Sequence, residues 1–293
     1  MSRVYVGTTS GLYVVEEYTE LADTVPVAAM SGHFVLLDGN TVCQEEDPVE
    51  TAVTFDGPPA GCLLWTGSEL FAGTQDAHLV RIGEGGGAPL ESFDQAPGRE
   101  TWYTPHGGPP TTRSLAAADD GTIYANVHVG GILRSSDGGG SWEPTIDIDA
   151  DVHQVVTVPG VPGMVLAASA RGLEQSEDGG NTWTTVIAGL HATYARAVAT
   201  SDEFMFLSVS RGFDGDQAAL YRRPLAARRR FERCRKGLPW SFTQNVDTAC
   251  LSAAGDVVAF GVDGSVFISR DGGTEWDEEV RRLPPITCVQ VAP

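Results

Sequence analysis

The sequence predicts an all-β chain of the β-propeller class, because one short turn motif recurs along it at a spacing that suits a four-stranded sheet. The three copies are Ser135–Trp142, Ser176–Trp183 and Ser269–Trp276, and they align without gaps. The first two copies begin 41 residues apart, and the second and third begin 93 residues apart, about two sheets. Short runs of β-branched and small residues between Gly-containing turns support the same class.

Each copy combines residues that stabilise a tight turn. The aspartate can accept hydrogen bonds from N–H groups of its own turn, and the paired glycines adopt positive φ at little cost. The tryptophan anchors the following strand in the core. In the third copy Glu275 replaces the usual Ser or Thr. We assign a structural role to Ser135, Asp137, Gly139, Trp142, Ser176, Asp178, Gly180, Trp183, Ser269, Asp271, Gly273 and Trp276.

The motif resembles the Asp-box, or BNR repeat, of sialidases, sortilin-type receptors and photosystem II assembly factors. The resemblance covers the three short segments directly and most of the chain by weaker periodicity. It implies a β-propeller in which these boxes occupy the side away from the ligand sites. It therefore says more about the fold than about the function.

Reading outward from the motif gives the other strands. The clearest sheet consists of Val152–Val158, Met164–Ser169, Gly172–Gln175 and Trp183–Ile187. Its first two strands, an inner Ala-rich one and a β-branched one, recur at Arg113–Ala118 with Thr122–Val127, Ala195–Thr200 with Glu203–Ser210, Asp247–Ala253 with Asp256–Val262, Ala28–Gly32 with Phe34–Asp38, and Cys62–Gly67 with Glu69–Thr74. Small side chains suit innermost strands.

The two ends of the chain complete one further sheet. Ile286–Ala292 has the pattern of an inner strand with nothing after it, whereas Arg3–Thr8 and Leu12–Glu16 resemble second and third strands with nothing before them. Sharing a sheet would close the ring and remove exposed edges. We expect a single domain over residues 1–293 with seven blades of about 42 residues each; six blades is the alternative.

The charge is strongly negative. The chain has 39 acidic and 19 basic residues, a formal net charge of −20, and Lys236 is its one lysine. This composition resembles that of proteins from salt-in halophiles, and we expect a halophilic archaeal source. We interpret the acidic residues mainly as a shell that maintains solubility.

Several classes are disfavoured by the sequence. No apolar run is long enough for a membrane helix, and the first residues read as a strand and not as a secretory signal. Five cysteines without C-x-x-C spacing, Cys43, Cys62, Cys234, Cys250 and Cys288, indicate buried free thiols instead of disulfides or zinc. We expect a cytoplasmic monomer without membrane contact, cofactor or metal.

Polar residues on the loops opposite the boxes are the candidate ligand-binding residues. Clustered Arg and His side chains in an acidic protein indicate an anionic or carboxylate-bearing ligand, or a protein partner. Pairing of the same side chains with neighbouring carboxylates is the alternative. The candidates are Trp102, Tyr103, His106, Arg113, His128, His153, Arg171, His191, Arg196 and Arg211.

The longest departure from the repeat is residues 83–112. We interpret it as an inserted loop on the ligand-binding face, with Trp102, Tyr103 and His106 as its aromatic and polar centre. A loop of this length in a compact domain is usually functional or disordered. Arg211–Ala218 is a shorter insertion on the same expected face.

A basic run extends from Arg222 to Lys236. Few aromatic residues lie among the basic ones, and the run falls where the outer hairpin of a sheet is expected. Nucleic-acid binding is therefore disfavoured, and a solvated or partner-facing edge is preferred.

Two functional hypotheses remain. The leading one is a non-catalytic intracellular binding scaffold. The alternative is a sialidase-like glycosidase for a carboxylated sugar, which the resemblance would associate with an Arg-Ile-Pro motif, three arginines and a Tyr/Glu pair. The chain has Arg81-Ile82-Gly83 instead, and Arg113, Arg196 and Arg211 could imitate the arginines. No Tyr/Glu pair can be identified from the sequence. We therefore assign no catalytic residue.

Overall fold

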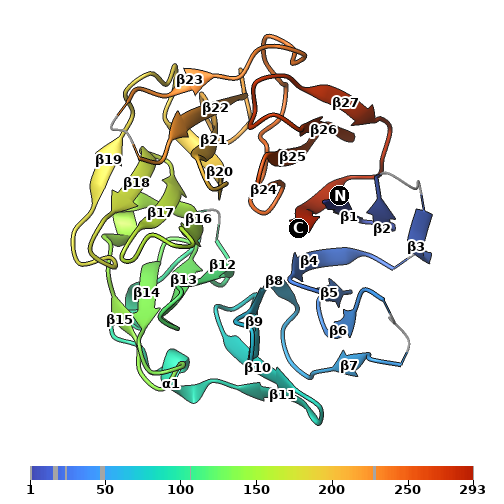
Figure 1. Ribbon diagram of the computed structural model, residues 1–293. Coiled ribbons are helices and arrows are strands. Elements are labelled where there is room, and N and C mark those ends of the chain that lie inside the picture. The colour runs from blue at the N-terminus through green and yellow to red at the C-terminus, as the bar shows by residue number, and fades with distance from the viewer. Residues whose placement is uncertain are drawn as a thin grey trace. The chain divides into compact units, whose positions relative to one another are not determined.

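The computed structural model describes residues 2–15, 19–23, 25–46, 50–105, 107–226 and 229–292. Their strands form seven four-stranded sheets, a seven-bladed β-propeller, which confirms the predicted fold class (Figure 1). The chain divides into two compact units, which are described separately. Unit 1 comprises residues 1–27, 168–174 and 185–293, and unit 2 comprises residues 28–167 and 175–184.

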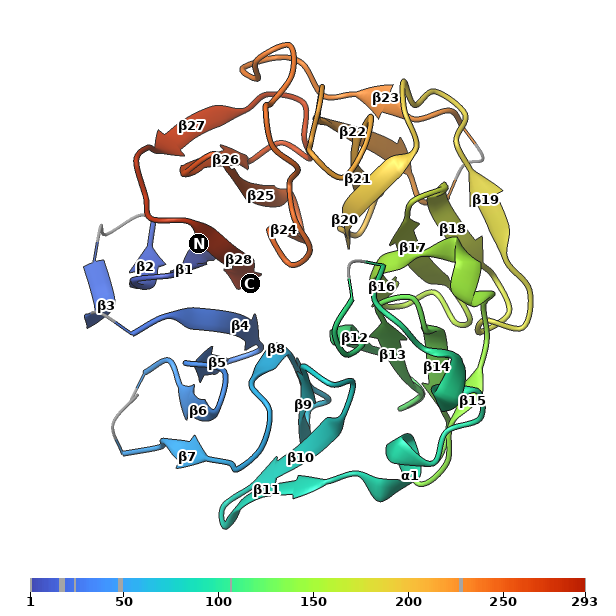
Figure 2. The same cartoon turned by 180° about the vertical axis from the view of Figure 1, so that it is seen from behind.

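Unit 1 contains the sheet that the two chain ends share. Its strands, in order, are β28 (Ile286–Ala292), β1 (Arg3–Thr8), β2 (Gly11–Val14) and β3 (Thr19–Asp23). Strands β28 and β1 pair antiparallel from Arg3 opposite Ala292, and Figure 2 shows the N- and C-termini at this sheet. The predicted sharing of one sheet by both ends is thus confirmed. The predicted strand end at Glu16 lies outside the described residues.

Two more sheets belong to unit 1. The first consists of β20 (Tyr194–Thr200), β21 (Phe204–Ser210), β22 (Ala219–Pro224) and β23 (Glu232–Arg233). The second consists of β24 (Leu251–Ala254), β25 (Val257–Val262), β26 (Ser265–Ser269) and β27 (Asp277–Val280). Strand β24 begins four residues later than predicted, because Cys250 N–H bonds back to the Asp247 carbonyl and Ala249 has a φ of 63°.

Unit 2 contains three complete sheets. The first consists of β4 (Val27–Ser31, whose first residue belongs to unit 1), β5 (Phe34–Leu37), β6 (Thr41–Gln44) and β7 (Val53–Thr54). The second consists of β8 (Ala60–Trp65), β9 (Leu70–Thr74), β10 (Leu79–Gly83) and β11 (Gly86–Pro89). The third consists of β12 (Thr112–Ala117), β13 (Ile123–Val127), β14 (Gly131–Ser135) and β15 (Glu143–Pro144).

The remaining sheet has residues in both units. It consists of β16 (Val152–Thr157), β17 (Val165–Ser169), β18 (Gly172–Ser176) and β19 (Thr184–Val186). The second strands of the sheets are the most deeply buried: every residue of β9 and of β13 is buried. A strand with packed side chains on both faces reads as a nearly continuous apolar run, which explains their sequences.

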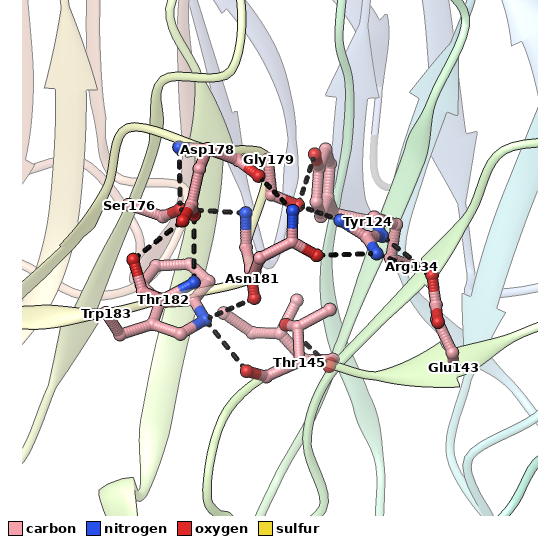
Figure 3. Close-up of polar contacts among 12 residues, drawn as sticks. Tyr124, Arg134, Glu143, Thr145, Ser176, Asp178, Gly179, Asn181, Thr182 and Trp183 are labelled. Atoms are coloured by element: carbon pink, nitrogen blue, oxygen red, sulfur yellow. Dashed lines mark hydrogen bonds and ion pairs between the residues drawn. The ribbon is translucent and has the colours of Figure 1, made fainter.

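The three repeated segments fold into closely similar turns, named here the Asp-Gly-Gly turns. In the second, Asp178 Oδ1 accepts from the Thr182 N–H at 2.8 Å, and Asp178 Oδ2 accepts from the Thr182 hydroxyl at 2.7 Å (Figure 3). The Ser176 hydroxyl donates to the carboxylate at 2.8 Å and accepts from the Gly180 N–H at 2.7 Å. Gly179 and Gly180 have φ of 71° and 92°, which glycine adopts without strain.

The other two turns repeat this pattern with one difference. Asp137 makes the same carboxylate bonds to the N–H and hydroxyl of Ser141, at 2.9 and 2.7 Å. Asp271 accepts from the Glu275 N–H at 2.9 Å, but the Glu275 side chain has no hydroxyl to offer and instead pairs with Lys236 at 2.6 Å. All three carboxylates are satisfied within their own turns, as expected for a structural role.

An arginine from the third strand of the preceding sheet binds each Asp-Gly-Gly turn. Arg81 donates to the Gly138 carbonyl at 2.7 Å, Arg134 to Gly179 at 2.6 Å and Arg222 to Gly272 at 2.6 Å (Figure 3 for Arg134). We call these three residues the turn-binding arginines. Each lies opposite an aromatic residue on the second strand of its sheet: Phe71, Tyr124 and Phe206. The turns therefore join neighbouring sheets.

Candidate functional site

Three of the predicted binding residues gather around one carboxylate in unit 2. His128 Nε2 lies 3.6 Å from Asp151 Oδ1, and His153 Nε2 lies 3.6 Å from Asp151 Oδ2. Arg113 is close enough for its charge to act on the same carboxylate. We call Arg113, Asn126, His128, Asp151 and His153 the Asp151 cluster.

Strand ends bring this cluster together. Arg113 is the second residue of β12, His128 directly follows β13, and Asp151 and His153 lie on either side of Val152, where β16 begins. Because β13 and β14 are antiparallel, His128 is at the opposite end of its sheet from the Asp-Gly-Gly turn that follows β14. Asp151 ends the short 3-10 helix η2 (Ile148–Ala150) with a φ of 49°, a conformation that aspartate tolerates better than most residues.

The neighbouring imidazole and guanidinium groups favour the ionised form of Asp151. His153, whose Nε2 lies 3.6 Å from Asp151 Oδ2, has the largest effect in lowering the pKa of the Asp151 carboxyl, and the charges of His128 and Arg113 act in the same direction, against the effect of burial. The His153 ring is fully buried, whereas the side chains of His128 and Asp151 are 20% and 28% exposed. The cluster is therefore partly exposed to solvent at His128 and Asp151.

Two buried acceptors in this cluster have no hydrogen-bond donor among the described residues. Asn126 is fully buried and donates from Nδ2 to the Val152 carbonyl at 3.1 Å, which leaves its Oδ1 unpaired. Asp151 Oδ1 is also a buried atom without a hydrogen bond. Buried polar atoms are nearly always paired with protein or ordered water. Both oxygens can therefore still accept a hydrogen bond, for example from water or from a ligand hydroxyl.

Residues 83–112 are more regular than predicted. Gly86–Pro89 form β11, the outer strand of a sheet, and Gly83 pairs with Gly86 across the hairpin that the triple glycine allows. The short helix α1 (Glu91–Asp94) and the 3-10 helix η1 (Arg99–Thr101) follow. The first part of this segment is therefore a hairpin that completes a sheet, and an insertion on the ligand-binding face over residues 83–112 stays a prediction.

The aromatic centre of this segment is divided between core and surface. Trp102 is only 8% exposed, and its ring centroid lies 5.6 Å from that of Phe93 in the core of unit 2. Trp102 therefore packs in the core, and its part in ligand binding stays a prediction. Tyr103 is 48% exposed. His106 lies outside the described residues.

In unit 1, His191 is held by its own sheet. Its Nε2 lies 3.0 Å from the Gln217 carbonyl and its Nδ1 lies 2.8 Å from the Tyr221 hydroxyl. Burial lowers the pKa of His191, and the charges of Arg233 and Arg211 lower it further. The neutral ring therefore donates from Nε2 and accepts from Tyr221. Both nitrogens are used, which indicates a structural role instead of ligand binding.

The three remaining predicted arginines are also in unit 1. Arg196 pairs with Asp247 at 2.7 Å, and Arg211 lies 3.8 Å from Asp216 in an exposed pair. Arg171 is exposed in the turn between β17 and β18. Arg196 thus follows the alternative reading, in which an arginine pairs with a neighbouring carboxylate.

Sequence reasoning missed the exposed Trp240, although the basic run that it identified contains Arg233 and Arg235 beside this ring. The guanidinium carbons of Arg233 and Arg235 lie 4.6 and 5.1 Å from the centroid of the Trp240 ring, and Trp240 is 69% exposed. The position of Trp240 just after the basic run was the available signal. Arg228 of that run lies outside the described residues.

The cysteines offer no activated nucleophile. All five are free and buried, as predicted. Burial raises the pKa of Cys62, Cys234 and Cys288 to about 12, so these thiols are protonated at neutral pH. Among the described residues no three His, Cys, Asp or Glu side chains are arranged to hold a metal ion.

Comparison with known proteins supports the fold alone. No protein-family model and no curated protein matches the chain. A Bacteroides uniformis protein provisionally named as a 6-phosphogluconolactonase superposes with a TM-score of 0.67 at 13% identity, over 99% of both chains. A chain of a nidogen–laminin complex gives 0.56 at 11% identity, over 100% of this chain and 99% of the other.

An ancestral GH74 enzyme gives a TM-score of 0.59 at 15% identity and covers 98% of this chain, which spans 39% of that enzyme. The class is therefore a seven-bladed β-propeller, and its neighbours include both hydrolases and protein-binding chains. Among the described residues, no helix has the length and apolar character required to span a bilayer.

Proposed function

We propose that the chain is a non-catalytic binding propeller whose Asp151 cluster takes a small hydroxylated carboxylate. The observation that supports this most directly is that two buried acceptors, Asn126 Oδ1 and Asp151 Oδ1, receive no hydrogen bond from the described residues, close to the cationic Arg113. A guanidinium can bind a carboxylate in a bidentate manner. The two acceptors suit hydroxyl donors on the same ligand.

The Asp-box assignment belongs to the same proposal. The self-contained hydrogen bonds of Asp137, Asp178 and Asp271 support it, because they make these turns structural and direct the search for ligands to the other ends of the strands. An intracellular location and a halophilic source are parts of the proposal that rest on composition.

Titration calorimetry with glucuronate, and with glucose as the neutral counterpart, tests the ligand class. We expect glucuronate to bind and glucose to bind at least tenfold more weakly. Arg113→Gln should reduce glucuronate affinity about tenfold or more, the effect of losing one charge-assisted contact. Arg270→Gln is the matched control, since Arg270 pairs with Glu279 in unit 1. Equal binding of both sugars, or no effect of Arg113→Gln, contradicts the proposal.

The glycosidase hypothesis is tested on the same variants. Ordinary glycosidases need two carboxylates at a defined separation, and the described contacts bring one, Asp151, to the cluster. A fluorogenic sialoside and a fluorogenic glucuronide should show no turnover. Turnover that Asp151→Asn abolishes would overturn the non-catalytic part of the proposal while leaving the ligand class intact.

A further inference from the structure

Positive charge is concentrated in one stretch of an acidic chain. Between Gln217 and Val246 there is one acidic residue, Glu232, and there are eight basic residues. The whole chain has a formal net charge of −20. A local reversal of sign of this extent produces a surface that attracts anions despite the repulsion from the rest of the molecule.

Part of this charge serves the fold. Arg222 binds an Asp-Gly-Gly turn, Arg223 is buried with its guanidinium 5.2 Å from the Phe231 ring centroid, and Lys236 pairs with Glu275. Arg233 and Arg235 differ, because both lie over an exposed aromatic ring and neither forms an ion pair with a carboxylate of the described residues.

Two loops of unit 1 present the largest exposed aromatic side chains among the described residues. Trp240 is 69% exposed and Phe213 is 72% exposed. Arg211 and Arg233 both lie close enough to His191 for their charges to lower the pKa of that histidine. We call Arg211, Phe213, Arg233, Arg235 and Trp240 the Trp240 surface.

The two loops are held together by backbone bonds. The Phe242 N–H donates to the Ala218 carbonyl at 2.9 Å, and Asn245 Nδ2 donates to the Phe213 carbonyl at 3.1 Å. An Arg233 guanidinium N–H also donates to the Trp240 carbonyl. The loops that carry the aromatic and cationic groups are thus connected to each other in the free chain, which reduces the entropy cost of binding.

We propose that the Trp240 surface docks a carboxylate-rich segment of another protein. Tryptophan and arginine are the residue types most enriched among those that dominate protein–protein binding. Carboxylates would pair with Arg233 and Arg235, and an apolar side chain of the partner would cover Trp240 and Phe213. The Trp240 surface belongs to unit 1 and the Asp151 cluster to unit 2, and the two share no residue. This inference therefore does not depend on the proposed ligand.

Nucleic acid fits the same surface less well. A base that stacked on the indole would compete with the guanidinium groups already lying over it. Polyanion binding also requires several phosphate contacts along an extended basic track. Here Asp214, Asp216 and Glu232 are exposed next to the surface and interrupt any such continuous basic track.

Fluorescence anisotropy tests the proposal with a fluorescein-labelled peptide of alternating glutamate and leucine. A single-stranded oligothymidylate of the same charge serves as the competing class. Measurements are made at the lowest salt concentration at which circular dichroism shows the folded protein. We expect the peptide to bind at least tenfold more tightly than the oligonucleotide, and its affinity to fall as salt rises.

Variants locate the binding. Arg233→Gln combined with Arg235→Gln, and separately Trp240→Ala, should each weaken peptide binding about tenfold or more. The matched control is Arg270→Gln combined with Arg281→Gln, which removes the same charge from two exposed ion pairs of unit 1. Equal losses in the control and the test variants, unchanged binding in the test variants, or tighter binding of the oligonucleotide would each overturn the proposal.

Discussion

At the residue scale, the chain depends on carboxylates whose bonds are local. Asp178 illustrates this, since it accepts from the N–H and hydroxyl of Thr182 and from the hydroxyl of Ser176. These bonds favour the charged form and lower the pKa of Asp178 to about 2 from its ordinary value of 3.8. The same holds for Asp137, whose pKa also falls to about 2.

The lowered pKa makes the turn sensitive to acid. Because the folded pKa lies below the unfolded value, Asp178 stabilises the fold above about pH 4, and this contribution disappears as the pH falls towards 2. We expect Asp178→Asn to lower the Tm at pH 6 and to have much less effect near pH 2. Thermal unfolding of both proteins across this range is the measurement. A Tm difference that stays constant with pH would contradict the assignment.

At the scale of the element, a turn is stabilised by the sheet before it. Arg134 contacts the Gly179 carbonyl, Asn181 and Glu143, and its side chain is 17% exposed. At the same position of β18 and β26 the chain has Gln175 and Ile268. The sheets that follow these two strands in the sequence have no Asp-Gly-Gly turn. Among these three strands, the arginine is thus found in the one whose next sheet carries an Asp-Gly-Gly turn.

Loss of Arg134 should therefore destabilise the fold. Arg134→Met keeps most of the side-chain bulk and removes charge-assisted hydrogen bonds, which are worth about 2 kcal/mol in total when partly buried. Urea unfolding should show a decrease of this size. Gln175→Arg is the control and should give no gain in stability, since no turn is available to it. If Gln175→Arg gained as much stability as Arg134→Met loses, arginine would act through its charge in general and not through its bonds to the turn.

A second element-scale prediction concerns strand β28. It pairs along the whole of β1, from Arg3 opposite Ala292 to Thr8 opposite Ile286. Removing residues 286–293 exposes the backbone groups of β1 and uncovers Val4 and Val6, which are buried. We expect the truncated chain to lose cooperative unfolding by circular dichroism. A synthetic peptide of residues 286–292 should restore it, and a fully stable truncated chain would contradict the prediction.

The strands could be predicted from sequence because each is a local pattern bounded by glycine-rich turns. The inner strand before β25 was placed too early, since Asp247–Cys250 has strand-like composition but closes a turn. The Asp151 cluster was only half predicted. Arg113, His128 and His153 stood out as rare cations, whereas Asp151 was hidden among 39 acidic residues. Trp240 was missed because no local pattern reports solvent exposure.

At the scale of the whole molecule, charge is the dominant feature. A net charge of −20 on 293 residues disfavours a compact state through self-repulsion. The basic segment from Arg222 to Lys236 offsets this only locally, because its arginines are engaged by turns and aromatic rings. The stability of the fold should therefore depend on the ions around it.

Salt should stabilise this chain steeply at low concentration. The Debye length falls from about 10 Å at 0.1 M to about 3 Å at 1 M, so repulsion among surface carboxylates is largely screened over that range. We expect the Tm to rise by at least about 3 °C between these potassium chloride concentrations, which corresponds to about 2 kcal/mol for a chain of this size. Differential scanning calorimetry gives the curve. Screening predicts a steep rise that levels off near 1 M, whereas a purely linear rise to 3 M would indicate ion exclusion instead of relieved repulsion.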